Sequence, residues 1–190
     1  MTGFIHCNLR VLMAERGLNI QNVKDQTTLS RTTISNLYNN YGSGVQFDTL
    51  TQLCSLLKCT PCEILTFVNI SVNFEDITSN IDTEIMKNIF ITDPSEGDGY
   101  EYVSQLNMSL MINCEINYGE KALEFEFKIN TVSEIDEKKN VLQTDKEIHK
   151  EYQSNLDNLK APIYVVDYVN EQLDQFLFEK INDTVNSIIL

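Results

Sequence analysis

Residues 30–39 combine side-chain types at a spacing that suits hydrogen bonding to nucleic acid. If the stretch is helical, one side is a polar face of short groups rich in donors and acceptors: Arg31, Thr32, Thr33, Ser35, Asn36 and Asn39. Such groups can approach base edges and phosphates closely. A solvated helix surface usually carries Glu and Lys, which form helices more readily than Thr, Ser and Asn. The composition therefore indicates a face that contacts DNA, and the alternative is an ordinary amphipathic surface helix.

The neighbouring residues predict a helix that begins at Ser30 and packs on a core. Ser30 can cap this helix, because its hydroxyl can accept a hydrogen bond from a free backbone N–H two or three residues further on. Ile34 and Leu37 are three residues apart and share the opposite face, over which Leu29 can close. With a turn at residues 27–28, the pattern predicts the turn and recognition helix of a helix-turn-helix.

The formal net charge of the chain, −14, is divided unevenly. Residues 1–67 hold five basic and four acidic residues, a net charge of +1. Residues 68–190 hold the other nine basic and 24 acidic residues, a net charge of −15. Because phosphates repel the acidic part, DNA contact is expected only in the first 67 residues. A charge of +1 also predicts weak non-specific DNA binding and dependence on dimerisation.

Helical signals on both sides of the recognition stretch predict an all-α bundle of five short helices in residues 1–67. The spacing of Ile5, Leu9, Leu12 and Met13 predicts the first helix, and Gly17 is placed to end it. Capping residues predict where other helices begin: Asn19 for the second, Asp48 for the fourth, and Thr60 with Pro61 and Glu63 for the fifth.

This arrangement resembles the Cro/lambda-repressor-like (Xre-type) helix-turn-helix family. The matching segments lie within residues 4–67: NLRVLMAERGLNI, TLSRTTISNLYNN, FDTLTQLCSLL and CTPCEIL. The resemblance implies which residues face the major groove, namely Arg31, Thr32, Thr33 and Asn36. It also implies that Asn39 and Asn40 approach the DNA backbone.

Two residues depart from the family pattern. Thr28 stands where the family often has Gly in the turn, and a non-Gly residue in a left-handed turn costs about 1 kcal/mol. Lys24 stands where a small Ala usually lets the second and third helices pack closely, although its charged head can extend into solvent. Both residues are therefore expected to affect the angle at which the second helix packs on the third.

Beyond residue 67 the hydrophobic period changes, which predicts an α+β domain over residues 68–190. Alternating apolar residues predict a strand at 68–74 and a hairpin of two long strands that turns at 117–120. The predicted buried faces are Leu106, Met108, Leu110, Ile112, Cys114 and Ile116 on one strand, and Leu123, Phe125, Phe127 and Ile129 on the other. Residues 75–92 fit either a helix or a strand, and residues 93–99 are predicted to be a loop.

A long helix at 163–187 is predicted to cover the apolar face of the sheet, and a helix pair between subunits is the alternative. Its apolar positions are Val166, Val169, Leu173, Phe176, Leu177, Ile181, Val185 and Ile188. A more polar helix is predicted at 144–158. The strands and the segment APIYVVDYVNE resemble the export chaperone SecB over about residues 66–182. That resemblance implies an oligomerising sheet domain with surfaces for extended polypeptide, and the alternative is an unrelated α+β dimerisation domain.

Residues that could carry catalysis or bind a metal are sparse. His6 and His149 are far apart, and the sequence contains no P-loop, dinucleotide fingerprint, HExxH motif or nucleophile elbow, so we expect no enzyme and no cofactor. Cys54, Cys59 and Cys62 form a C-x4-C-x2-C pattern, but zinc needs four ligands and packing explains these residues more simply. We therefore predict no metal. The odd number of cysteines and the absence of an export signal favour the reducing cytoplasm.

Together these observations predict a sequence-specific DNA-binding transcriptional regulator, in particular a dimeric repressor of phage or mobile-element type. Its expected partners are an operator with an inverted repeat and a second copy of the chain, but no membrane. The C-terminal domain would dimerise and sense an inducer, which could be a protein such as an antirepressor. The alternative is a chaperone-like or antitoxin protein that captures a polypeptide through its C-terminal sheet and autoregulates its operon.

Overall fold

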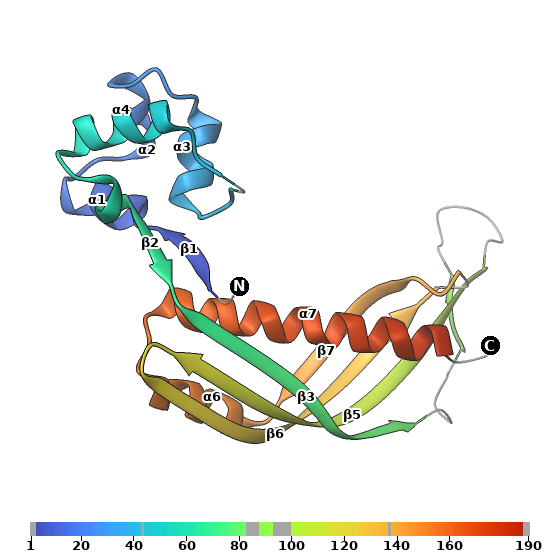
Figure 1. The fold of residues 1–190 in the computed structure, drawn as a ribbon. Helices are drawn as coiled ribbons and strands as arrows, with labels where there is room; N and C mark the ends of the chain where they lie inside the picture. Colours follow the sequence, from blue (N-terminus) through green and yellow to red (C-terminus); the bar gives the residue numbers. More distant parts are fainter. Residues whose placement is uncertain (1–2, 43, 83–87, 93–99, 137, 188–190) are drawn as a thin grey trace. The chain divides into compact units, whose positions relative to one another are not determined.

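The structure, a computed structural model, describes residues 3–42, 44–82, 88–92, 100–136 and 138–187. The chain forms two compact units, Met1–Ile70 and Ser71–Leu190 (Figure 1). The first unit is mostly helical, and the second has an antiparallel sheet with a long C-terminal helix, so the predicted α+β class is confirmed. No helix in the described ranges is both long and apolar enough to cross a membrane. The assignment of DNA binding to residues 1–67 and of oligomerisation and effector binding to residues 68–190 stays a prediction.

The first unit contains short helices around one core. The helices are α1 (Leu9–Glu15), α2 (Ile20–Asp25), α3 (Arg31–Tyr38), α4 (Phe47–Leu57) and α5 (Pro61–Ile64). Their inner sides meet in a hydrophobic cluster in which Leu9, Val23, Ile34, Leu53 and Leu57 are fully buried. This cluster fixes the apolar side of α3, which carries Ile34.

The predicted ends of several helices are confirmed. Gly17 has a φ of 62° directly after α1, and the N–H of Leu18 donates to the carbonyl of Met13, which closes the last turn. The side chains of Asn19 and Asn22 each accept a hydrogen bond from the other's backbone N–H at the start of α2. At α5, the backbone N–H and the hydroxyl of Thr60 both donate to the Glu63 carboxylate.

The predictions for the starts of the first and fourth helices were wrong. Ile5 lies in strand β1 (Phe4–Cys7), which pairs antiparallel with β2 (Leu65–Val68), so α1 begins only at Leu9. Ile5 is 58% exposed opposite Phe67 and does not enter the core. The unit is therefore not purely helical, because a partner strand far along the chain takes the residues whose spacing indicated a helix. At α4 the capping position belongs to Gln46, and Asp48 lies in the first turn.

The second unit is built on an antiparallel sheet whose strands are ordered β3–β5–β6–β7, with β4 also pairing to β5. The strands are β3 (Ile70–Asp82), β4 (Asn88–Thr92), β5 (Tyr100–Tyr118), β6 (Lys121–Ile135) and β7 (Val141–Ile148). The predicted hairpin of β5 and β6 is confirmed: Ile112 lies opposite Phe127, and the chain turns at residues 119–120. The predicted face of β5 from Leu106 to Ile116 is buried throughout.

Helices α6 (Lys150–Leu159) and α7 (Ile163–Ser187) follow the sheet, and α7 lies along its apolar face, as predicted (Figure 1). The ring of Phe176 on α7 lies 5.8 Å from that of Phe74 on β3. The ammonium of Lys180 on α7 lies 2.7 Å from the carboxylate of Asp76. Because side chains of α7 contact the sheet of their own chain, packing of α7 within one subunit is confirmed, and a helix pair between subunits stays an untested prediction.

Three details of the second unit differ from the predictions. The buried row of α7 begins at Val165, whereas Val166 is only partly buried, and Ile188 lies outside the described residues. Residues 144–148 belong to β7, so the predicted helix at 144–158 begins only at residue 150. Within residues 75–92, which fit either a helix or a strand, residues 75–82 belong to β3 and residues 88–92 form β4. Residues 83–87 and the predicted loop at 93–99 lie outside the described residues.

Candidate nucleic-acid interface

Helix α3 begins at the predicted cap. The hydroxyl of Ser30 accepts a hydrogen bond from the backbone N–H of Thr33 at 3.0 Å, and the two hydroxyls of Ser30 and Thr33 are 2.8 Å apart. An N-terminal cap satisfies one of the backbone donors that the first helical turn leaves free. The predicted capping role of Ser30 is therefore confirmed.

The inner side of α3 is locked into the core of the first unit. Ile34 is fully buried, Leu29 is 9% exposed, and Leu37 packs against the same cluster. Val23 of α2 is fully buried in this cluster. Because four apolar side chains fix one side of the helix, the opposite side can present only its polar groups to a partner.

The turn between α2 and α3 is held by hydrogen bonds to α4 as well as to α2. Gln52 on α4 accepts from the backbone N–H of Thr28 at 2.8 Å and from its hydroxyl at 3.1 Å. The Thr27 hydroxyl donates to the Val23 carbonyl at 2.8 Å. Thr28 is not among the non-Gly residues with positive φ in the described ranges, so the expected left-handed strain at this turn is absent. Lys24 is exposed and leaves the packing of α2 on α3 undisturbed.

The polar face of α3 contains three exposed residues whose side chains remain available. Within the part of the chain that the structure describes, no hydrogen bond or ion pair engages the side chains of Arg31, Thr32 and Asn36. The other members of the face have partners of their own. Thr33 and Ser35 are half-buried, and the Asn39 amide donates to the Ser35 carbonyl at 2.9 Å.

The side chain of Asn40, which the family resemblance places near the DNA backbone, binds strand β1 in the structure. Its Oδ1 accepts from the backbone N–H of Cys7 at 2.6 Å, and its Nδ2 donates to the carbonyl of Cys7 at 3.2 Å. Both halves of the amide are therefore occupied by strand β1. The approach of Asn40 to the DNA backbone stays a prediction, beside this observed role within the first unit.

Basic residues near α3 are few. The guanidinium of Arg10 on α1 lies over the ring of Tyr38 on α3, 5.4 Å from its centroid, and Arg10 is exposed. Arg10 was not predicted, because its stacking on Tyr38 depends on the packing of two helices and leaves no local sequence signal. Arg16 is less available, because its guanidinium donates to the carbonyls of Leu57 and Leu12.

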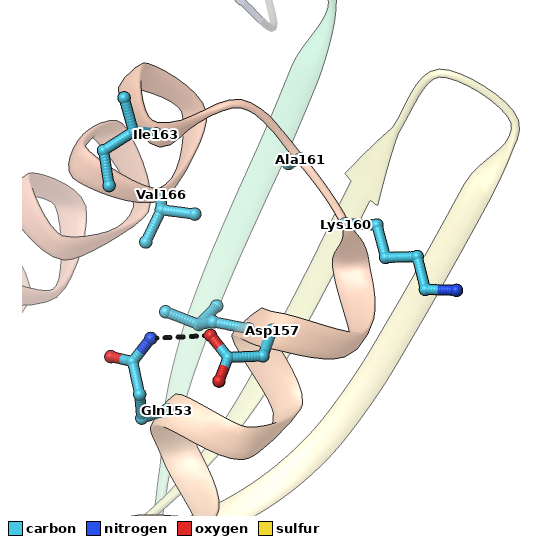
Figure 2. A pocket seen from close by; sticks show the side chains of 7 residues that line it. Gln153, Asp157, Lys160, Ala161, Ile163 and Val166 are labelled. Atoms are coloured by element: carbon cyan, nitrogen blue, oxygen red, sulfur yellow. Dashed lines mark hydrogen bonds between the residues drawn. The ribbon is translucent and has the colours of Figure 1, made fainter.

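In the part of the chain that the structure describes, neither the cysteines nor the hollow between α6 and α7 forms a recognisable site. In the described ranges no group of three or more His, Cys, Asp or Glu residues is placed to hold a metal ion. A hollow of about 290 Å³ lies where α6 turns into α7 (Figure 2), and it is lined by Gln153, Leu156, Asp157, Lys160, Ala161, Ile163 and Val166. The Gln153 amide donates to the Asp157 carboxylate at 3.0 Å. Because these two polar groups bind each other and the volume is at the lower limit for a ligand pocket, we assign it no ligand.

The class of the first unit follows from its fold, its capped α3 and a comparison with known families. Residues 8–69 match the family model of the Cro/C1-type HTH DNA-binding domain. This part of the chain is therefore a Cro/C1-type helix-turn-helix domain, and the protein is a DNA-binding transcription regulator. No curated protein matches the chain. The likeness of residues 66–182 to SecB is not confirmed and stays a prediction.

Proposed function

We propose that the protein is a sequence-specific repressor of phage or mobile-element type that binds an inverted-repeat operator as a dimer. One observation carries the assignment of contacts: α3 presents Arg31, Thr32 and Asn36 exposed and unengaged in the described structure, while its other side is buried. Their side chains match the donors and acceptors of base edges in the major groove. Thr33, Ser35 and Asn39 complete the proposed contact surface, with Asn39 approaching a phosphate.

The charge distribution supports dimerisation as part of this function. A net charge of +1 in residues 1–67 supplies little of the electrostatic attraction that most of the affinity for DNA depends on. Two copies of the domain on one duplex would double the contacts, at a half-site separation of about 34 Å, one helical turn. We propose that the second unit joins the two copies and that an inducer acts by changing this association. The net charge of −15 in residues 68–190 repels the second unit from DNA phosphates.

Selection of DNA by the full chain tests this proposal. The purified protein is incubated with a pool of random-sequence duplexes, bound duplexes are amplified over several rounds, and the enriched sequence is footprinted. We expect an inverted repeat, protection of both half-sites, and a protein mass in the complex equal to two chains. Enrichment of no sequence, or protection of a single half-site by one chain, would contradict the proposed dimeric repressor.

A second function, capture of a polypeptide by the C-terminal sheet, is favoured by the position of β7 at one edge of the sheet. Strand β7 pairs with β6 and ends the strand order of the sheet. The apolar face proposed for such capture is covered by α7, so a polypeptide would have to add as a strand beside β7. In that case the backbone amides of β7 should become protected from hydrogen exchange when a partner polypeptide binds. Unchanged exchange of residues 141–148 in the complex would exclude this mode.

A further inference from the structure

The end of the recognition helix is tied to strand β1 by one side chain. Asn40 follows α3 with a φ of 59°, a left-handed conformation that Asn tolerates better than most residues. From this position its amide makes both the acceptor and the donor bond to Cys7, at 2.6 and 3.2 Å. These are the two backbone groups that a neighbouring strand would pair, so Asn40 takes the place of a strand partner at one residue of β1.

The strand that receives this tie is itself firmly held. Cys7 pairs with Leu65 across the β1–β2 ribbon. The next residue, Asn8, is also held by hydrogen bonds: its backbone N–H donates to the Ile64 carbonyl at 2.7 Å, and its side-chain amide donates to the Thr66 hydroxyl at 2.9 Å. Cys7 is 6% exposed and lies in the core cluster of the unit. The tie therefore connects α3 to a fixed support.

Helix α3 depends on such ties more than a longer helix would. It has eight residues, and Thr, Ser and Asn occupy half of them, all weak helix formers. Ile34 is its one fully buried side chain, and Leu37 and Tyr38 pack against the same cluster only partly buried, so hydrogen bonds at the two ends of α3 add to the restraint on its orientation. Its first turn is fixed by the Ser30 cap. Its last turn has the two hydrogen bonds from Asn40 to Cys7.

We propose that Asn40 is a positioning residue for DNA recognition, and this inference rests on the proposed function. By fixing the C-terminal end of α3 on the β1–β2 ribbon, Asn40 sets the angle at which Arg31, Thr32 and Asn36 meet the major groove. Base contacts require donor and acceptor positions accurate to a fraction of an ångström, whereas phosphate attraction tolerates a tilted helix. Loss of the tie should therefore lower specific affinity much more than non-specific affinity.

Two substitutions remove the tie in steps without straining the backbone. Asn40→Gly keeps the left-handed conformation and deletes both hydrogen bonds. Asn40→Asp keeps the acceptor for the Cys7 N–H and replaces the donor to the Cys7 carbonyl with a carboxylate oxygen. It also lowers the net charge of residues 1–67 from +1 to 0, which weakens attraction to both duplexes alike and cancels in the ratio of affinities. The matched control is Lys160→Gly, which makes the same kind of replacement at a left-handed position (φ 48°) at the end of α6.

The measured quantity is the ratio of affinity for the duplex selected by the wild-type chain to affinity for an unrelated duplex of equal length. Thermal unfolding of each variant is recorded first, and binding is compared at a temperature at which every variant is folded. We expect the ratio to fall at least about tenfold in Asn40→Gly and about threefold in Asn40→Asp, and to stay unchanged in Lys160→Gly. The backbone N–H of Cys7 should exchange faster with solvent in Asn40→Gly.

Each outcome bears on the inference. An unchanged ratio in Asn40→Gly despite faster exchange at Cys7 would overturn it, and so would an equal loss of affinity for both duplexes. Should Asn40→Gly fail to fold, the ratio in Asn40→Asp decides in the same way. A wild-type chain that enriches no duplex overturns the proposed function, and this inference with it. A wild-type chain that selects an operator which the Asn40 variants bind equally well overturns the positioning role alone.

Discussion

Replacing Arg31 with alanine and, separately, with lysine tests whether the polar face of α3 contacts base edges or only phosphates. Arg31 is exposed at the first position of α3, and in the described part of the chain its side chain has no hydrogen-bond or ion-pair partner. Neither substitution removes an internal contact. The free energy of unfolding should therefore change by less than about 0.5 kcal/mol.

The two substitutions separate charge from geometry. A guanidinium can donate two parallel hydrogen bonds to one guanine, whereas an ammonium acts as a point charge. Loss of a base contact costs about 1–3 kcal/mol, which raises the Kd for the selected duplex about 5- to 150-fold. Arg31→Lys keeps the charge of +1 in residues 1–67 and should lose specific affinity alone. Arg31→Ala should also weaken non-specific binding and lower the salt slope by about 1.

Fluorescence anisotropy with the selected duplex and an unrelated duplex, over about 50–200 mM salt, measures these quantities. Lys24→Gln is the control, because it removes one positive charge from an exposed position on α2. It should weaken binding to both duplexes by the same factor. If Arg31→Lys binds the selected duplex as tightly as the wild type, Arg31 contacts phosphates only and the assignment of a base contact is refuted.

Three further predictions concern stability and reactivity. Ser30→Ala removes the acceptor for the Thr33 N–H and should lower the free energy of unfolding of the first unit by about 1 kcal/mol, measured by thermal unfolding. Leu173→Ala empties a fully buried site on α7 and should cost about 2–5 kcal/mol in the second unit, by denaturant titration. A thiol reagent at mild alkaline pH should modify exposed Cys62 at once but Cys114 only on unfolding, because burial raises the pKa of the Cys114 thiol to about 12.

The features that could be predicted from the sequence depend on residues close together in the chain. Ser30 and the Thr60–Glu63 pair cap helices within one turn, so the residue types alone indicate the hydrogen bonds that form. The alternation from Leu106 to Ile116 indicates a half-buried strand without knowledge of its partner. The polar face of α3 was found for the same reason, because the spacing within one short helix separates it from Ile34.

The features that were missed depend on pairing between distant residues. Ile5 has helical spacing from Leu9, but β1 pairs with a strand about sixty residues further on, and that pairing determines its conformation. The family resemblance places Asn40 near the DNA backbone, and the residue types alone do not indicate that its amide binds Cys7, 33 positions away. Strand β7 was missed because its sequence is mostly polar, and its conformation follows from pairing with β6 and from the ion pair of Lys146 with Asp174 on α7.

The two faces of the C-terminal sheet limit how the second unit can associate. One face is filled by α7 and by Tyr152 of α6, whose ring lies 4.7 Å from that of Phe127. The other face points Glu124 and Glu126 of β6 outward, and Glu124 lies directly opposite Glu115 on β5. The negative charges of these carboxylates repel DNA phosphates, and they would also repel the same face of a second copy. The contact that joins two chains in the proposed dimer is therefore expected at an edge of the sheet or along the helices, away from its acidic face.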